Sequence, residues 1–281
     1  MGKAFLSRYR GILPDTLALA KNANTGGLIH YNLLEPGALP SEITTGTYTD
    51  ALVLAGISRI KTCEDNMEMT GKVNVTGVLT LMRELVKRQI KPIFFTTDYV
   101  FDGTTGSYTE TSAFNPLNEY GRQKAFVESY MKNTFDNYLI VRLGKVFSHE
   151  KGDGTLLDEM ASVFSKGGTV RAASDQVFCP LPVTDLIEVV ISLQIKNVAG
   201  TINVCSFKPC SRYELALTLA KEMGISSDKV EKITLAQLNE SFIRPLNTSL
   251  LTDRLRGIFE GKLTPLQDSV KRVAGNWKDV C

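Results

Sequence analysis

Short apolar runs alternate with longer segments of helical periodicity through the first two-thirds of the chain. The apolar runs predict strands, and they lie at Ala4–Ser7, Leu28–Tyr31, Ala51–Leu54, Ile93–Thr96 and Tyr138–Leu143. Between them, apolar residues at helical spacing predict helices at Asp15–Asn22, Gly71–Gln89 and Tyr120–Asn133. This alternation is typical of a parallel sheet with helices on both faces, and the short connections favour a Rossmann-like, doubly wound α/β fold.

The pattern becomes less regular after about Lys145. Helical segments are predicted at Leu156–Ser165, Ser211–Met223 and Leu235–Asn239, from about Thr184, and from Pro265 to about Trp277. We therefore expect residues 1–145 to form a nucleotide-binding domain to which some later segments return. Residues 146–281 are expected to form mainly a smaller lobe.

Composition and charge exclude several classes of protein. The 281 residues are 43% hydrophobic, which is enough for a large core. The 32 basic and 30 acidic residues leave a net charge of +2 without a basic block, so no nucleic-acid partner is expected. No membrane span or signal peptide is recognisable, which favours a cytoplasmic protein without a membrane partner. Five scattered cysteines and two histidines predict reduced thiols and no metal site.

The candidate chemistry lies between Thr96 and Lys124, in the strings TTDYVFDG and NPLNEYGRQK. Tyr120 and Lys124 are four residues apart, so in a helix they lie on one face. An ammonium beside a phenol lowers the pKa of the phenol, and Thr97, at a strand end, can hold a carbonyl for protonation by Tyr120. The pair alone also suits a solvated helix face. Its place at the end of a buried strand, where open α/β sheets bind ligands, favours a site.

These strings resemble the extended short-chain dehydrogenase/reductase superfamily, and most closely its dTDP-4-dehydrorhamnose reductase family. The motifs occur in unbroken order, and the similarity continues at VNV, VRL, DQVFCP and RPLN, so it covers about the whole chain and is weakest over the first fifty residues. The resemblance implies catalytic roles for Thr97, Tyr120 and Lys124, with Tyr99 facing the substrate. It also implies that the smaller lobe binds a sugar nucleotide.

The resemblance implies an oxidoreductase of carbohydrate biosynthesis, acting on a nucleotide-linked keto-sugar or a related carbonyl compound. NADP(H) is the implied cofactor. NAD(H) and the absence of any cofactor stay open as alternatives. A homodimer formed through the long helices is a further expectation at the level of the family.

The predicted cofactor loop departs from the superfamily pattern. The first strand should lead into Gly-x-x-Gly-x-x-Gly, but here the same spacing holds Arg8, Gly11 and Pro14. Arg8 and Arg10 can replace the backbone contacts with charge-assisted contacts to phosphate. Alternatively, the cofactor pocket is impaired, or these residues form an ordinary solvent-facing loop.

Other candidate cofactor contacts follow the next strands. The segment His30-Tyr31-Asn32 lacks an acidic residue for a ribose hydroxyl, which argues against NAD. Ala55 and Gly56 are small residues where the sugar of the cofactor would lie. In the superfamily the position of Asn74 supports the active site, and an amide buried for packing is the equal alternative.

On the substrate side, two basic residues stand out. Lys145 occupies a position where the related reductases have an aromatic residue, so it can pair with an anionic substrate or be solvated. Arg244 matches a motif of the second lobe and can contact a diphosphate or form a structural ion pair. The sequence therefore leaves three functions open: a reductase, a non-catalytic binding or regulatory subunit similar to that of methionine adenosyltransferase, and a non-redox enzyme using Tyr120 and Lys124.

Overall fold

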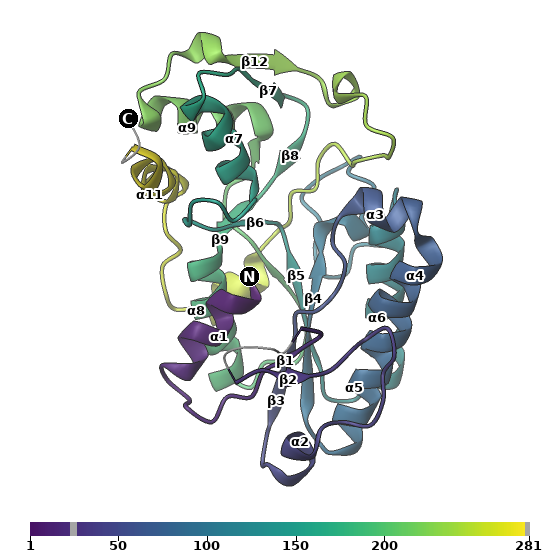
Figure 1. The fold of residues 1–281 in the computed structure, drawn as a ribbon. Coiled ribbons are helices and arrows are strands. Elements are labelled where there is room, and N and C mark those ends of the chain that lie inside the picture. The colour runs from purple at the N-terminus through teal and green to yellow at the C-terminus, as the bar shows by residue number, and fades with distance from the viewer. Residues whose placement is uncertain (23–26, 279–281) are drawn as a thin grey trace.

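A four-stranded parallel sheet forms the centre of the computed structural model, which describes residues 1–22 and 27–278 (Figure 1). Its strand order is β10-β5-β4-β3. The bounds of the strands are Asp50–Val53 for β3, Lys91–Thr97 for β4, Leu139–Leu143 for β5 and Gly200–Val204 for β10. Among the described residues, no helix combines the length and apolar character needed to cross a membrane.

Helices cover both faces of this sheet, so the doubly wound α/β prediction is confirmed. Phe94 packs with α5 (Val78–Lys87) and α6 (Glu119–Thr134) on one face. Ile93 and Phe95 pack on the other face, since alternate residues of a strand point to opposite sides. That second face carries α1 (Gly2–Arg10), α8 (Val183–Ile195) and α10 (Asp253–Ile258).

A second core lies in the upper part of Figure 1. It is built from α7 (Leu156–Ser165), α9 (Arg212–Met223) and α11 (Leu266–Lys278), together with the parallel pair β7 (Val170–Ala173) and β12 (Val230–Ile233). α9 packs on both strands of this pair and α7 on β7, while α11 packs on α7 and α9. Two further pairs are β6 (Lys145–Phe147) with β9 (Pro180–Pro182), and β8 (Val177–Phe178) with β11 (Cys210–Ser211). The predicted helix at Leu235–Asn239 is a 3₁₀ turn, Leu235–Leu238.

The N-terminal predictions are wrong. Ala4–Ser7 is not a strand but lies within α1, because Phe5 and Tyr9 share one helix face and are both buried. Phe5 packs edge-on against Phe95, with ring centroids 5.4 Å apart. A short apolar run cannot be assigned to strand or helix by periodicity alone, and here the aromatic contact with the sheet decides.

The predicted helix at Asp15–Asn22 is also wrong. Leu17 and Leu19 are two residues apart and pack into the same core, which is the spacing of a strand. Leu19–Ala20 forms β1, which pairs in parallel with β2 (Ile29–His30) outside the four-stranded sheet.

The long helix predicted at Gly71–Gln89 is present in three consecutive parts. They are α4 (Met67–Gly71), a π-helical segment at Lys72–Gly77, and α5. Such π-helical segments are frequent at functional sites. This one presents Asn74 toward the end of β3, and α3 (Ile60–Asp65) precedes it. A short helix, α2 (Ser41–Thr45), lies earlier in the chain.

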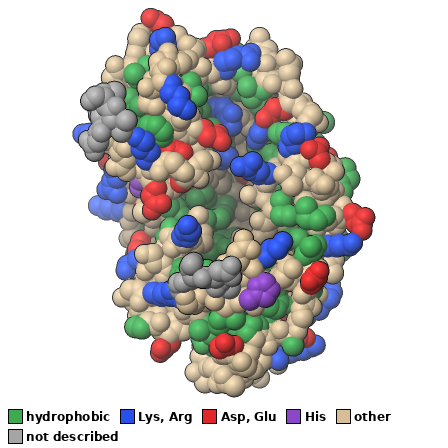
Figure 2. All heavy atoms as spheres, viewed as in Figure 1, with side chains coloured by type: hydrophobic (Ala, Val, Ile, Leu, Met, Phe, Trp, Pro, Cys, Tyr) green, Lys and Arg blue, Asp and Glu red, His purple; other side chains and the backbone are tan. Residues whose placement is uncertain are grey.

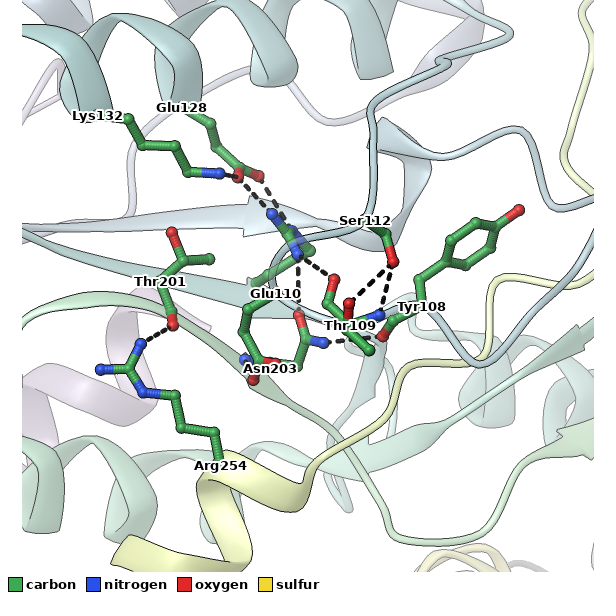
Figure 3. Close-up of polar contacts among 10 residues, drawn as sticks. Tyr108, Thr109, Glu110, Ser112, Glu128, Lys132, Thr201, Asn203 and Arg254 are labelled. Carbon is green, nitrogen blue, oxygen red and sulfur yellow. Dashed lines mark hydrogen bonds and ion pairs between the residues drawn. The ribbon is translucent and has the colours of Figure 1, made fainter.

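A buried ion pair ties α6 to the sheet (Figure 3). Arg142 on β5 and Glu128 on α6 are both fully buried, and Arg142 Nη2 lies 2.8 Å from Glu128 Oε2. Arg142 Nη1 also donates to Asn203 Oδ1 on β10 at 3.1 Å. The charge pair therefore joins two strands to the helix that carries Tyr120 and Lys124.

Candidate active site

Local features of α6 bring the predicted catalytic residues together at the carboxyl end of β4. Asn118 caps the helix, and its side-chain oxygen accepts from the Gly121 N–H at 2.9 Å. A Cβ on Gly121 would stand 2.2 Å from the carbonyl oxygen of Tyr99, so only glycine allows α6 to approach the 3₁₀ turn Asp98–Val100. This approach sets Tyr120 beside Thr97, the last residue of β4.

Hydrogen bonds constrain the three side chains. Thr97 Oγ1 donates to Asp98 Oδ1 at 3.0 Å and accepts from the Tyr99 N–H at 3.2 Å. The Thr97 side chain also lies close to the Tyr120 hydroxyl, whose pKa it lowers. Lys124 Nζ donates to the Phe95 carbonyl at 3.0 Å and lies 4.4 Å from the centre of the Phe94 ring. Tyr120 and Lys124 are therefore held in place and are not a solvated helix face.

The pKa values differ from the expectation. Burial raises the pKa of Tyr120, the charge of Asp98 raises it further, and the hydrogen bond with Thr97 opposes both effects. The predicted lowering of the phenol pKa is therefore not observed. Burial also lowers the pKa of Lys124 to about 8, since desolvation disfavours its charged form. At neutral pH Tyr120 is a protonated donor, as an acid catalyst must be.

A cavity of about 100 Å³ opens beside these residues. Its wall is formed by the ends of β3 and β4, by α6 and by the start of α1. The lining includes Met1, Gly56, Ile57, Thr96, Tyr120 and Lys124. This position is the carboxyl edge of the parallel sheet, where open α/β folds bind their ligands.

Asn74 holds the loop that borders the cavity. Its side chain accepts from the Ile57 N–H at 2.7 Å and donates to the Ile57 carbonyl at 2.9 Å and to Gln123 Oε1 at 2.8 Å. A Cβ on Gly56 would stand 3.1 Å from Asn74 Oδ1 and 3.8 Å from Lys124 Nζ. Asn74 thus positions the loop that contains Ala55 and Gly56, and glycine keeps the space above Lys124 open.

Arg8 and Arg10 lie in α1 and Gly11 follows it, so the segment is not a turn between a strand and a helix, and none of the three lines this cavity. Arg8 Nε donates to Glu188 Oε1 on α8 at 2.8 Å, and Arg10 donates to the Gly27 carbonyl at 3.1 Å. Gly11 follows α1 with right-handed helical dihedral angles. At about 1.5 Å per residue, Arg8 lies about 10 Å along α1 from Met1. The spacing that resembled a degenerate glycine loop is the end of a helix.

Three basic residues, Lys145, Arg212 and Arg244, lie near one another, and Arg244 lies next to Tyr99. Arg244 forms a two-pronged ion pair with Glu240, and its Nη1 lies 3.5 Å from the Tyr99 hydroxyl. The pKa of Lys145 is lowered to about 8 by burial and by the charges of Arg212 and Arg244. Basic side chains are also visible around the hollow between the upper and lower parts of the molecule in Figure 2.

Sequence reasoning missed Arg212. It is the first residue of α9, and burial and the charge of Arg244 lower its pKa. Its Nε is buried and has no hydrogen-bond partner among the described residues. An arginine at a helix start carries no recognisable signal, because only the fold places it beside Lys145 and Arg244.

The parallel sheet with helices on both faces is a Rossmann-like, doubly wound α/β fold, and solved structures share it. Within that class, the chain belongs to the RmlD substrate-binding domain family, whose family model matches residues 35–278. The match begins after the N-terminal segment in which the structure departs from the expected strand and loop.

Two proteins of known classes are similar to this chain in sequence. A probable low-salt glycan biosynthesis reductase of Haloferax volcanii is 27% identical over 230 residues, which cover 80% of this chain and 76% of that protein. The methionine adenosyltransferase 2 subunit beta of Danio rerio is 23% identical, with 96% of this chain and 86% of that protein covered.

Two solved structures share the fold. A hypothetical dTDP-4-dehydrorhamnose reductase from Sulfolobus tokodaii has a TM-score of 0.82, is 24% identical and covers 95% of this chain and 94% of its own. The dTDP-4-dehydrorhamnose reductase of Bacillus anthracis, solved in complex with NADP, has a TM-score of 0.72, is 21% identical and covers 80% of this chain and 79% of its own.

The residues around the cavity fit the nicotinamide end of such a cofactor. The Thr96 hydroxyl is buried without a hydrogen-bond partner among the described residues, and Gly56 leaves space above Lys124. The residues do not supply the usual site for the pyrophosphate of such a cofactor. In the part of the chain described before Ala55, no glycine-rich turn connects a strand of the four-stranded sheet to a helix. The cavity is also smaller than the roughly 300–1,000 Å³ of typical ligand pockets.

Proposed function

We propose that the protein reduces the carbonyl group of a nucleotide-linked keto-sugar, with NADPH as the cofactor. The observation that carries this proposal is the meeting of Thr97, Tyr120 and Lys124 at the carboxyl end of β4, beside a cavity open to a ligand. The reductases among the similar proteins support the substrate class. The solved reductase complex with NADP supports the choice of cofactor.

The chain's own residues supply the acid chemistry. Tyr120, protonated at neutral pH, donates its proton to the carbonyl oxygen as that oxygen gains negative charge. Lys124 is buried on the same helix face and stabilises the phenolate that remains. Thr97 fixes the position of the Tyr120 hydroxyl. When bound, the nicotinamide supplies the hydride that the carbonyl carbon accepts.

Binding of the cofactor is the first test of this function. A ligand that binds only the folded state raises the melting temperature, and it does so more at a given concentration when it binds more tightly. We expect NADPH to raise the melting temperature more than NADH does, since no acidic residue follows β2 at His30-Tyr31-Asn32. Thermal-shift titration with both nucleotides measures this. The absence of any shift at about millimolar NADPH, well above a typical Kd, would contradict the reductase function.

Lys145, Arg212 and Arg244 support an anionic substrate. Burial first, and then the charges of neighbouring arginines, lower the pKa values of Lys145 and Arg212. Only Arg244 has an ion-pair partner among the described residues. A diphosphate would neutralise this cluster through charge-assisted hydrogen bonds. Tyr99, held by Arg244, then faces the sugar.

We expect the Lys145→Met variant to bind dTDP roughly 10- to 100-fold more weakly, since a charged hydrogen bond contributes on the order of 1.5–3 kcal/mol. Wild-type affinity should also fall as the pH rises through about 8, where Lys145 loses its charge. Isothermal titration calorimetry measures both effects. Lys166→Met, at an exposed position on the same lobe, is the matched control and should bind dTDP normally. Equal affinity in the Lys145 and Lys166 variants would remove Lys145 from the site.

A specific observation also supports a second function, that of a non-catalytic binding or regulatory subunit. The start of α1 lines the cavity through Met1, and the glycine turn of a dinucleotide site is absent from the described residues before Ala55. The similarity to the methionine adenosyltransferase subunit covers 96% of this chain. In that case sugar nucleotides would still bind at the basic cluster, but no cofactor would raise the melting temperature.

A further inference from the structure

We propose that Asp98 is a positioning residue that controls, through one proton, whether the Thr97 hydroxyl can donate a hydrogen bond to the Tyr120 oxygen or to the carbonyl oxygen of the substrate. This inference rests on the function proposed above, because the carbonyl is the ligand of that site. It concerns a residue that lies between the catalytic positions and that the acid chemistry has not yet used.

With Asp98 ionised, the single proton of the Thr97 hydroxyl is already used in a hydrogen bond. A hydroxyl has one proton to donate and two lone pairs to accept with. The Thr97 proton goes to Asp98 Oδ1 at 3.0 Å, and one lone pair takes the Tyr99 N–H at 3.2 Å. While Asp98 is ionised, Thr97 therefore has no proton to donate to the Tyr120 oxygen or to a substrate.

Protonation of Asp98 reverses the direction of the bond at 3.0 Å. The carboxyl O–H now donates to Thr97 Oγ1 and occupies its second lone pair. The Thr97 proton is thereby released, and Thr97 can donate it to the Tyr120 oxygen or to the carbonyl oxygen of a substrate. Asp98 keeps its proton throughout, and the proton consumed in the reduction comes from Tyr120.

The surroundings of Asp98 allow both states. Asp98 is buried, and Thr248 Oγ1, from the chain between β12 and α10, donates to its Oδ2 at 2.6 Å. Burial raises the pKa of Asp98 to about 6, against the hydrogen bonds from Thr248 and Thr97 and the charge of Lys145. Other ionisable groups coupled to it are Tyr99 on the same 3₁₀ turn, Tyr120 on α6, and the thiols of Cys179 and Cys205. None of these carries a positive charge at neutral pH, so Lys145 is the cation that opposes burial here.

The Asp98→Asn variant tests the proposal because its amide copies the protonated carboxyl. The amide N–H can donate to Thr97 while the amide oxygen accepts from Thr248. For the wild type, we expect kcat/KM to fall by about tenfold per pH unit above the pKa of Asp98 in the free enzyme. The variant should retain activity without this fall. A variant that keeps the wild-type fall, or that is folded but inactive at every pH, would overturn the proposal.

Thr248→Val provides a second test, because a purely structural role of Asp98 would not predict a shift of the pH profile in this variant. It removes a donor to the ionised carboxylate while nearly preserving shape, and it should therefore raise the pKa of Asp98. We expect the fall in kcat/KM to move to higher pH. A profile that stays in place, or that moves to lower pH, would contradict the role of Asp98.

Two readouts do not require turnover and separate this proposal from the proposed function. The affinity for dTDP-glucose, measured by calorimetry, should weaken above pH of about 6 in the wild type and stay level in Asp98→Asn. The folded pKa of Asp98 lies above the ordinary 3.8, so its contribution to stability is present at low pH and lost as the pH rises through about 6.

The melting temperature of Asp98→Asn should therefore gain on the wild type between about pH 4.5 and about pH 7.5. A constant difference in melting temperature, or parallel affinity profiles, would overturn the proposal even if the protein reduced no substrate. If the protein reduced no substrate but the affinity and the melting temperature changed with pH as expected, the result would count against the proposed function alone.

Discussion

Replacing Tyr120 with Phe is expected to reduce kcat by roughly 10²- to 10⁴-fold, the range that a positioned proton donor contributes. The substitution removes only the hydroxyl, so the ring can keep its place in the first turn of α6. The proton would then have to come from water, which the buried position of the phenol disfavours. Steady-state kinetics with a nucleotide-linked 4-keto sugar and NADPH measure the loss.

The matched control for this variant is Tyr130→Phe, on the same helix. Its hydroxyl accepts from Arg83 Nε at 2.8 Å, at an exposed site far from the cavity lining. We expect near-normal kcat from it, and an unchanged affinity of both variants for dTDP. If Tyr120→Phe turned over at the wild-type rate, Tyr120 would not be the acid.

Replacing Glu128 with Gln is expected to lower the free energy of unfolding by about 3–5 kcal/mol, as removal of one partner from a buried ion pair typically does. Arg142 would keep its charge in the core with one fewer anionic partner, since both side chains are fully buried. The charge of Glu128 also raises the pKa of Lys124, so the variant should move that pKa below about 8. Urea unfolding measures the first effect.

Two comparisons make the test of Glu128 specific. Glu84→Gln removes an ion pair with Lys87 and Arg88 on the surface of α5 and should leave the urea midpoint unchanged. The double variant Glu128→Met/Arg142→Met removes both buried charges and should be more stable than Glu128→Gln alone. A double variant that is the less stable of the two would show that packing or the bond with Asn203, and not the charge pair, holds this region together.

The central part of the fold was predictable because its signals are local. The apolar run before Thr97 and the cap at Asn118 fix where β4 ends and α6 begins, and the predicted helix at Tyr120–Asn133 differs from the observed one by one residue at each end. The pairing of Tyr120 with Lys124 follows from helical spacing alone. The division of the chain at about residue 145 stays a prediction, and α8 and β10 from beyond it pack on the central sheet.

The remaining features depend on contacts between distant segments. Arg8, Gly11 and Pro14 keep the spacing of a phosphate loop, yet the packing of Phe5 on Phe95 makes the segment a helix. Burial sets the pKa of Tyr120, and no sequence spacing reports burial. Arg212 and the hydrogen bond from Thr248 to Asp98 come from segments more than a hundred residues after the catalytic strand.

Transfer of deuterium from the reduced nicotinamide of labelled NADPH to the sugar is the most direct measurement of the proposed reduction. The product formed from a dTDP-linked 4-keto sugar is analysed by mass spectrometry and NMR. We predict that deuterium appears on the former carbonyl carbon in the wild type and is nearly absent with Tyr120→Phe, while both proteins bind dTDP. A folded, dTDP-binding wild-type protein that transfers no label to the sugar would contradict the role of this site in carbonyl reduction.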